Sequence, residues 1–160
     1  MPTKVFISHQ KRDRNEAEKI AKYLSRVGID VYFDEYDREL QIATANDDPK
    51  AVVNAIKKGI NNSTHMLCVI SKNTLTSKWV PFEVGYGFDK TDLATVILKG
   101  VSNTELPDYI KTAPVIRDIY DITSFANKYG NKFILETKMF SDYKNESHPL
   151  NDVMDRLITM

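Results

Sequence analysis

Trp79 and Glu83 are the two residues whose types and spacing most clearly suggest chemistry. They lie in the aromatic segment Thr76–Phe88, TSKWVPFEVGYGF. In a helix, residues four apart project to the same side, so the indole and the carboxylate would share a face. Aromatic neighbours lower the local dielectric, which strengthens the action of a carboxylate on a developing positive charge. The pattern alone leaves two alternatives open, a solvated helix residue for Glu83 and a core residue for Trp79.

Other common site chemistries lack their signatures. The sequence contains neither GxGxxG nor GxxxxGK[ST], the glycine patterns that hold dinucleotides and phosphates. Its three histidines, His9, His65 and His148, do not have the spacing of metal ligands, so we expect no metal site. Cys68 lies within the apolar run HMLCVIS, which predicts a small buried hydrophobe and not a nucleophile.

Composition and charge limit the possible partners and the compartment. Lys and Arg together number 22 and so do Asp and Glu, so no net field would attract nucleic acid or an anionic membrane. The single cysteine excludes an intrachain disulfide and fits a reducing cytosol. The opening MPTKVFISHQ leaves no room for a signal peptide, and no apolar run approaches the length of a membrane span. We therefore expect one cytoplasmic domain over residues 1–160, with no nucleic-acid or membrane partner.

Apolar patterning predicts strands that alternate with helices. The expected strands are Lys4–Ser8, Asp30–Asp34, His65–Ser71 (the central one), Ala94–Lys99 and Val115–Ile122. Helices are expected from a capping box at Asp13 to Gly28, from Asp48-Pro49 onward, and over Asp152–Ile158, and the segment Thr76–Phe88 is expected to be a loop followed by a helix. Residues 36–48 are predicted to be a long polar loop, and residues 125–148 a helix with a loop. This order is typical of an α/β fold with a parallel sheet that is covered on both faces.

Ligands of parallel sheets bind beyond the carboxyl ends of the strands. Three segments should meet at that edge: Ser8–Lys11, Asp34 with its loop, and Ser71–Glu83. The acid in the aromatic segment is thereby expected at the open end of the sheet.

Four segments in this order resemble the Toll/interleukin-receptor (TIR) domain, and specifically its stand-alone bacterial form. They are VFISH at Val5–His9, DVYFDEYD at Asp30–Asp37, AVVNAIKKGINNSTHMLCVIS at Ala51–Ser71 and SKWVPFEVGYG at Ser77–Gly87. The last matches the family signature in which Trp stands four residues before a catalytic Glu. The resemblance covers Lys4 to Ile122 and implies a flavodoxin-like fold, with a central five-stranded parallel sheet and helices on both faces. One departure is the loop after Asp34, which lacks the glycine often found there.

Enzymatic members of this family cleave the nicotinamide–ribose bond of NAD. The resemblance therefore implies that Glu83 is the catalytic acid and that NAD is a substrate, with no cofactor. By the same correspondence, Trp79 would be an aromatic platform and Asp34 would lie at the mouth of the cleft. The substrate-binding loop beside the nucleotide would consist of Ser8, His9, Gln10 and Lys11. The product would be ADP-ribose or a cyclic ADP-ribose isomer, acting as an antiphage immune signal for a downstream effector.

Two alternatives stay open. Many TIR domains are non-catalytic adaptors that act by homotypic association, and the loop Tyr36–Asp48 would then be the contact surface. The enzyme and adaptor functions can coexist, because family enzymes often complete their site by stacking protomers. A more distant alternative is a nucleoside deoxyribosyltransferase-like enzyme, which also sets a single Glu against a ribosyl ring. Turnover of deoxynucleosides but not of NAD would favour that enzyme.

Overall fold

The structure is a computed structural model of the chain. It describes residues 3–33, 38–72, 74, 80–101, 106, 108, 113–131 and 148–155, apart from the side chains of residues 38, 39 and 80. Asp34 and Trp79, two of the expected site residues, lie outside the described residues.

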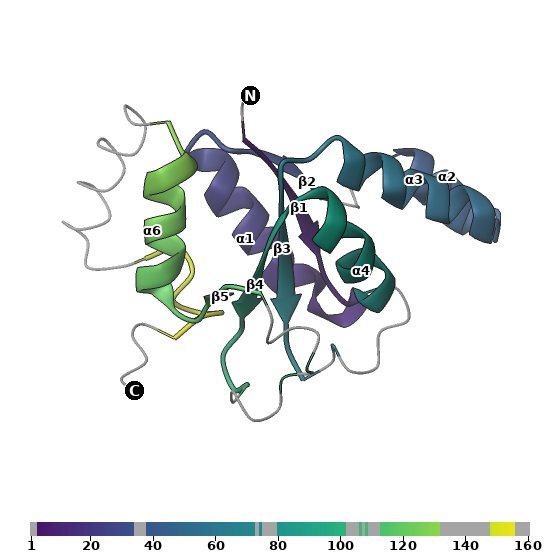
Figure 1. Cartoon of the computed structure of the whole chain (residues 1–160). Coiled ribbons are helices and arrows are strands. Elements are labelled where there is room, and N and C mark those ends of the chain that lie inside the picture. Colours follow the sequence, from purple (N-terminus) through teal and green to yellow (C-terminus); the bar gives the residue numbers. More distant parts are fainter. Residues whose placement is uncertain are drawn as a thin grey trace.

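Within the described residues, five parallel strands form one sheet in the order β2-β1-β3-β4-β5 (Figure 1). They are β1 (Lys4–Ser8), β2 (Asp30–Tyr32), β3 (His65–Ile70), β4 (Asp92–Ile97) and β5 (Val115–Ile116). β3 lies in the middle and all six of its residues are buried, as its continuous apolar run predicts. The predicted α/β class with a parallel sheet is confirmed.

Helices cover both faces of this sheet. They are the short 3-10 helix η1 (Lys11–Asp13) and the α-helices α1 (Arg14–Arg26), α2 (Arg38–Ala45), α3 (Pro49–Asn61), α4 (Val80–Lys90) and α6 (Ile119–Tyr129). Alternate residues of β3 point to opposite faces. Val69 packs in the cluster formed with α1 and α6, and Met66 in the cluster formed with α2, α3 and α4. Each face therefore has its own hydrophobic core.

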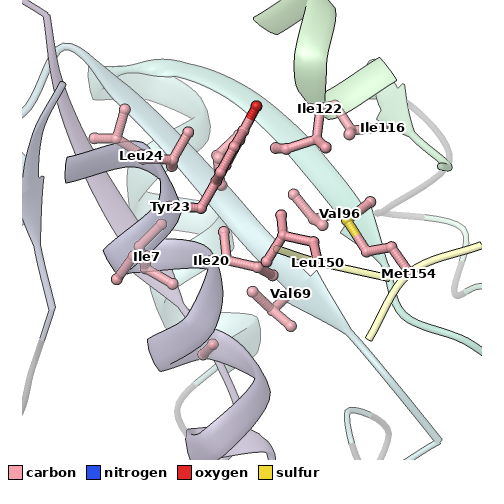
Figure 2. Close-up of a cluster of buried hydrophobic side chains, with 14 of the residues drawn as sticks. Ile7, Ile20, Tyr23, Leu24, Val69, Val96, Ile116, Ile122, Leu150 and Met154 are labelled. Atoms are coloured by element: carbon pink, nitrogen blue, oxygen red, sulfur yellow. The ribbon is translucent and has the colours of Figure 1, made fainter. Parts of the chain in front are cut away.

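The first of these cores also contains a C-terminal segment. Figure 2 shows Leu150 and Met154 beside Ile20 of α1 and Val96 of β4. Leu150 and Met154 are fully buried. Because large apolar side chains contribute roughly 1.5–3 kcal/mol each when buried, this segment belongs to the folded unit and not to a loose tail.

Two local signals place helix ends as predicted. The side chain of Asp48 accepts a hydrogen bond of 3.2 Å from the backbone N–H of Ala51, and Pro49 is the first residue of α3. At the other boundary, α1 ends before Gly28, whose φ of 87° lies in the left-handed region. A Cβ at Gly28 would also lie 2.6 Å from the Cβ of Asn131, so glycine is required there for space as well.

The segment expected to be a loop between Tyr36 and Asp48 is largely helical. Helix α2 occupies Arg38–Ala45, so the prediction of a long loop was wrong. Leu40 and Ala43, three residues apart, are both buried in the core shared with α3, which gives this polar segment one apolar face. Their burial depends on the neighbouring helix and not on local propensity.

The predictions for the last third of the chain need correction. β5 ends at Ile116, and of the expected strand Val115–Ile122 the last four residues, Ile119–Ile122, belong to α6. Asp118 causes the change, because its side chain accepts a hydrogen bond of 2.9 Å from Asp121 N and so starts a helix. Residues 151–154 form turns and a bend, and Asp155 pairs with Asp118 as an isolated bridge, so the closing helix is absent over its described part. Residues 125–148 were expected to be a helix with a loop. Helix α6 ends at Tyr129 within this region, and residues 132–147 are not among those that the structure describes.

His65, the first residue of β3, makes stability depend on pH. Burial lowers its pKa from the ordinary 6.5, Lys128 lowers it further, and Asp92 opposes both effects. The unfolded chain therefore binds this proton at a higher pH than the folded protein does. The stability contribution is complete above about pH 6.5 and is lost as pH falls below that value. We expect the difference in the midpoint urea concentration of unfolding between wild type and His65→Gln to be smaller at pH 5 than at pH 8. A difference that does not change with pH would contradict this.

No helix in the described ranges combines the length and the apolar character that crossing a membrane requires.

Candidate functional site

Ser8 and Glu83, 75 residues apart in sequence, meet at the carboxyl end of β1. Ser8 is the last residue of β1 and is 1% exposed, and Glu83 is half-buried in the first turn of α4. The Ser8 hydroxyl donates a hydrogen bond to Oε2 of Glu83. The carboxylate is therefore turned toward the sheet and oriented by a buried donor. This is the sheet edge at which the sequence predicted the acid to lie.

Cys68 forms the floor beneath this pair. The register between β1 and β3 sets Ser8 beside Cys68, so their side chains lie on the same face of the sheet. Burial raises the pKa of the Cys68 thiol well above its ordinary range, and the charge of Glu83 raises it further. The sequence correctly predicted a buried cysteine. It did not predict that this cysteine adjoins the acid, since only the strand register brings the two together.

The Cys68 thiol should be chemically inert in the folded protein. It is completely buried, and its raised pKa leaves almost no thiolate at neutral pH. We expect alkylation by iodoacetamide at pH 8 to be at least about 100-fold slower than in the urea-unfolded chain, followed by mass spectrometry of the intact protein. Equal rates in the two states would show that Cys68 is accessible and would remove it from the floor of the site.

Close packing of α4 brings Glu83 down to the sheet. Gly87 lies one helical turn after Glu83 on the same face, where a Cβ would come within 2.4 Å of the Met66 side chain in β3. Val84, the residue after Glu83, is buried in the same core. The glycine thus leaves room for the end of the Met66 side chain beneath α4, on the helix face that also carries Glu83.

Two aromatic side chains of α4 lie on the side of this helix that faces α3. The rings of Phe82 and Tyr86 stack with centroids 6.3 Å apart, and both residues are partly buried. The Tyr86 hydroxyl donates a 2.9 Å hydrogen bond to Oδ1 of Asn61 at the end of α3, and Lys57 Nζ lies 5.6 Å from the Tyr86 ring centroid. These contacts fix α4 against α3.

The loop after β1 is held by its own side chains. The ring of His9 stacks on Phe33, with centroids 5.0 Å apart and an interplanar angle of 26°. Gln10 is the N-cap of η1, and its side-chain oxygen accepts a hydrogen bond from the backbone N–H of Arg12. Lys11 is exposed at the start of η1. The structure therefore brings Ser8 to Glu83, and it uses the oxygen of Gln10 as a helix cap.

Asp13 and Ser71 connect the two loops that flank the site. Asp13 was expected to cap α1 in a capping box, but its side chain makes no capping hydrogen bond. Instead its buried carboxylate, 4% exposed, accepts a hydrogen bond from the Ser71 hydroxyl beyond β3. The backbone N–H of Ser71 donates in turn to Oγ1 of Thr74, at 2.8 Å, within a tight turn. Sequence reasoning missed this pair because it joins residues 58 positions apart.

Among the residues that the structure describes, no group of three or more His, Cys, Asp or Glu side chains could hold a metal ion. The described residues at this site are one acid, one buried hydroxyl and a loop with an exposed cation.

The comparisons with known proteins bear directly on this arrangement. A family model described as the TIR domain matches residues 5–132, well over half of the chain. The chain belongs to the TIR domain family. A search of curated proteins gave no significant match. The TIR assignment confirms the resemblance seen in the four sequence segments, and the five-stranded parallel sheet agrees with the flavodoxin-like fold of the family.

Proposed function

We propose that this TIR domain cleaves the nicotinamide–ribose bond of NAD, with Glu83 as the catalytic carboxylate. The observation that carries the proposal is the hydrogen bond from the buried Ser8 hydroxyl to Glu83 at the carboxyl end of the sheet. A surface carboxylate with no special role would point to solvent. The acid of the family signature is instead oriented by a strand residue at the edge where α/β folds bind ligands.

The reaction needs little more than a positioned carboxylate. Nicotinamide leaves NAD as a neutral molecule from a cationic ring, so no general acid is required to expel it. The barrier lies in the positive charge that develops on the ribose. Glu83 would stabilise that oxocarbenium-like charge, as carboxylates do in glycosidases, and accept hydrogen bonds from ribose hydroxyls. A carboxylate has about four acceptor positions, so the bond from Ser8 leaves the group able to bind substrate.

The remaining expected residues take their roles from the family correspondence. Trp79 would be the platform for a planar ring, His9, Gln10 and Lys11 would lie along the nucleotide, and Asp34 would stand at the mouth of the cleft. Ser8 acts in this proposal as the residue that positions Glu83 below the sugar. Trp79, Pro81 and Phe82 would exclude water around the acid and so strengthen its electrostatic effect.

Two products are compatible with this step. Water can capture the ribosyl cation to give ADP-ribose. An adenine nitrogen or a ribose hydroxyl of the same molecule can attack instead and give a cyclic ADP-ribose isomer, which proximity favours when the adenine folds back. Either product is diffusible, so it could act in the cytoplasm as an antiphage signal to a separate effector.

The direct test is incubation of purified protein with NAD over a range of protein concentrations. We expect nicotinamide release, with ADP-ribose or a cyclic isomer identified by mass spectrometry. Specific activity that rises with concentration would indicate that stacking of protomers completes the site. Absence of nicotinamide release at every concentration, including under crowding that drives association, would contradict the proposal.

An adaptor function is the second candidate, and the surface of α2 favours it. Ile42 on this helix is 60% exposed, and it lies in the segment expected to mediate self-association, residues 36–48. An exposed large apolar side chain on a short helix suits a contact between TIR domains. Ile42→Lys should abolish self-association measured by light scattering if the adaptor function holds. A matched change on α1, Lys22→Glu, should leave association unaltered, since Lys22 is solvent-exposed and away from α2.

A further inference from the structure

A cavity lies beside the amino end of β4, away from the Ser8–Glu83 pair. Its volume is about 600 Å³, within the range of roughly 300–1,000 Å³ that small-molecule sites occupy. The lining residues that matter for the argument come from β3, β4 and α6, and they are His65, Asp92, Ala94, Phe125, Lys128 and Tyr129. Neither Ser8 nor Glu83 lines it. The cavity is therefore a separate feature of the molecule.

One wall of the cavity is a cluster of three rings. His65 packs on Tyr129 with centroids 4.4 Å apart, and Phe125 packs on Tyr129 at 4.8 Å. His65 and Phe125 meet edge to face at 6.1 Å. Phe88, at the end of α4, lines the cavity as well and is 54% exposed. Flat apolar walls of this kind suit a planar ring, which can stack on them or meet their edges.

The hydrogen bonds of Thr64 determine which nitrogen of His65 carries its proton. The Thr64 hydroxyl accepts a bond from Lys4 N at 3.0 Å and donates its only proton to Lys4 O at 3.1 Å. It lies 2.8 Å from Nδ1 of His65, and with the hydroxyl proton assigned to Lys4 O the donor in that contact is Nδ1. Burial lowers the pKa of His65, which keeps the ring neutral near pH 7. Nε2 is then a hydrogen-bond acceptor.

This acceptor is buried and has no hydrogen-bond partner among the described residues. His65 as a whole is 9% exposed. The nearest charged atom is Oδ2 of Asp92, 3.6 Å from Nε2, and this oxygen is also an acceptor. Two acceptors that face each other at this distance repel unless a donor lies between them. The Asp92 side chain is 86% exposed, so it can change rotamer to admit such a donor.

The remaining charges of the cavity make its polar wall rich in acceptors. Asp121 lines it and already accepts a hydrogen bond of 3.0 Å from Arg117 N through Oδ2. Lys128 lines it on the side of Tyr129, with Nζ 5.2 Å from the ring centroid. The two acids against one base favour a neutral or weakly cationic ligand over an anion.

We propose that this cavity binds a small planar heteroaromatic compound bearing an exocyclic amino group. The amino group donates to His65 Nε2 and to the Asp92 carboxylate, and the ring lies against Phe125 and Tyr129. One NH2 group carries two protons, and the two acceptors are close enough for it to bond to both. The proposal does not depend on the proposed NAD cleavage, because none of its residues takes part in that reaction.

A matched pair of probes tests the proposal on the full chain. 9-Methyladenine carries the amino group, and 9-methylpurine has the same ring system without it. We expect titration with 9-methyladenine to shift the backbone amide NMR signals of Asp92–Ala94 and Phe125–Tyr129 in a saturable manner. 9-Methylpurine should bind about five-fold more weakly, since it lacks one to two hydrogen bonds.

Variants assign this difference to His65 and Asp92. His65→Phe keeps a ring but removes one of the two acceptors, so the difference in affinity between the two probes should shrink. Asp92→Ala, at an exposed side chain that does not support the core, removes the other acceptor and should shrink the same difference, which keeps the test decisive if His65→Phe fails to fold. Asp152→Asn is the control, because this exposed acid lies outside the cavity lining, and its affinity should equal that of wild type.

Three results would overturn the proposal. One is the absence of saturable shifts at the named amides up to the solubility of the probe. Another is equal affinity of the wild-type chain for the two probes. The third is a set of shifts confined to Ser8–Lys11 and the first turn of α4, which would place the ring in the candidate active site instead.

Discussion

Glu83→Gln is expected to lower the rate of nicotinamide release from NAD by about 10³-fold or more, with the fold intact. Glutamine has the same shape and its side-chain oxygen can still accept the hydrogen bond from Ser8. It lacks the negative charge that would stabilise the ribosyl cation, and removal of a single preorganised electrostatic group commonly costs 10²–10³-fold or more in rate. The measurement is chromatographic quantitation of nicotinamide, with circular dichroism and thermal melting to confirm the fold.

The matched control for this substitution lies on the same helix. Asp89→Asn also removes one carboxylate from α4, but Asp89 is largely exposed and its nearest cation is its neighbour Lys90, at 3.4 Å. Surface ion pairs of this kind contribute little, so the turnover and melting temperature of Asp89→Asn should match wild type. A Glu83→Gln protein that turns over NAD at the wild-type rate would refute the catalytic role of this residue.

The hydrogen bond between Ser71 and Asp13 is expected to have the second largest effect. Ser71→Ala removes a donor to a buried carboxylate, and hydrogen bonds to charged groups are worth about 1.5–3 kcal/mol. We expect the free energy of unfolding, measured with urea, to fall by that amount. Because the bond joins the loop after β1 to the segment that leads to Glu83, kcat should fall as well, with a smaller change in KM.

A double-mutant cycle separates this bond from other effects of the two side chains. Asp13→Ala, Ser71→Ala and the double variant should show a coupling energy of about 1–3 kcal/mol. Ser124→Ala is the control, since Ser124 is exposed on α6. Among the contacts that the structure describes, its hydroxyl donates a hydrogen bond of 3.0 Å to Tyr120 O within the same helix. It should alter the stability by less than about 0.5 kcal/mol. Additive effects of Asp13→Ala and Ser71→Ala would show that the two side chains are not energetically coupled.

Much of the fold follows from local sequence signals. The run HMLCVIS has five consecutive apolar residues, which is typical of a strand buried on both faces, and it contains the central strand β3. Asp48 with Pro49 marks the start of α3, and Gly28 marks the end of α1. These signals act between residues that are neighbours in the chain, so they can be read without knowledge of the tertiary structure.

Local signals failed where a distant partner decides the conformation. Leu40 and Ala43 of helix α2 are buried only because α3 packs against them. The boundary between the fifth strand and α6 is a different case, because the apolar spacing fits either state and the cap at Asp118 that selects the helix acts over only three residues. Asp13 has the composition of a capping residue, yet its carboxylate is bound by Ser71. Single-sequence patterns do not contain these competing partners.

For the candidate site, the sequence by itself determined the residue types: one acid in an aromatic segment, a serine that ends the first strand, and a buried cysteine. Only the tertiary structure decided that these three meet. The parallel register of β1 and β3 sets Ser8 beside Cys68, and the close approach of α4 at Gly87 lowers Glu83 onto them. Strand register and helix height result from the packing of whole faces, which no short segment specifies alone.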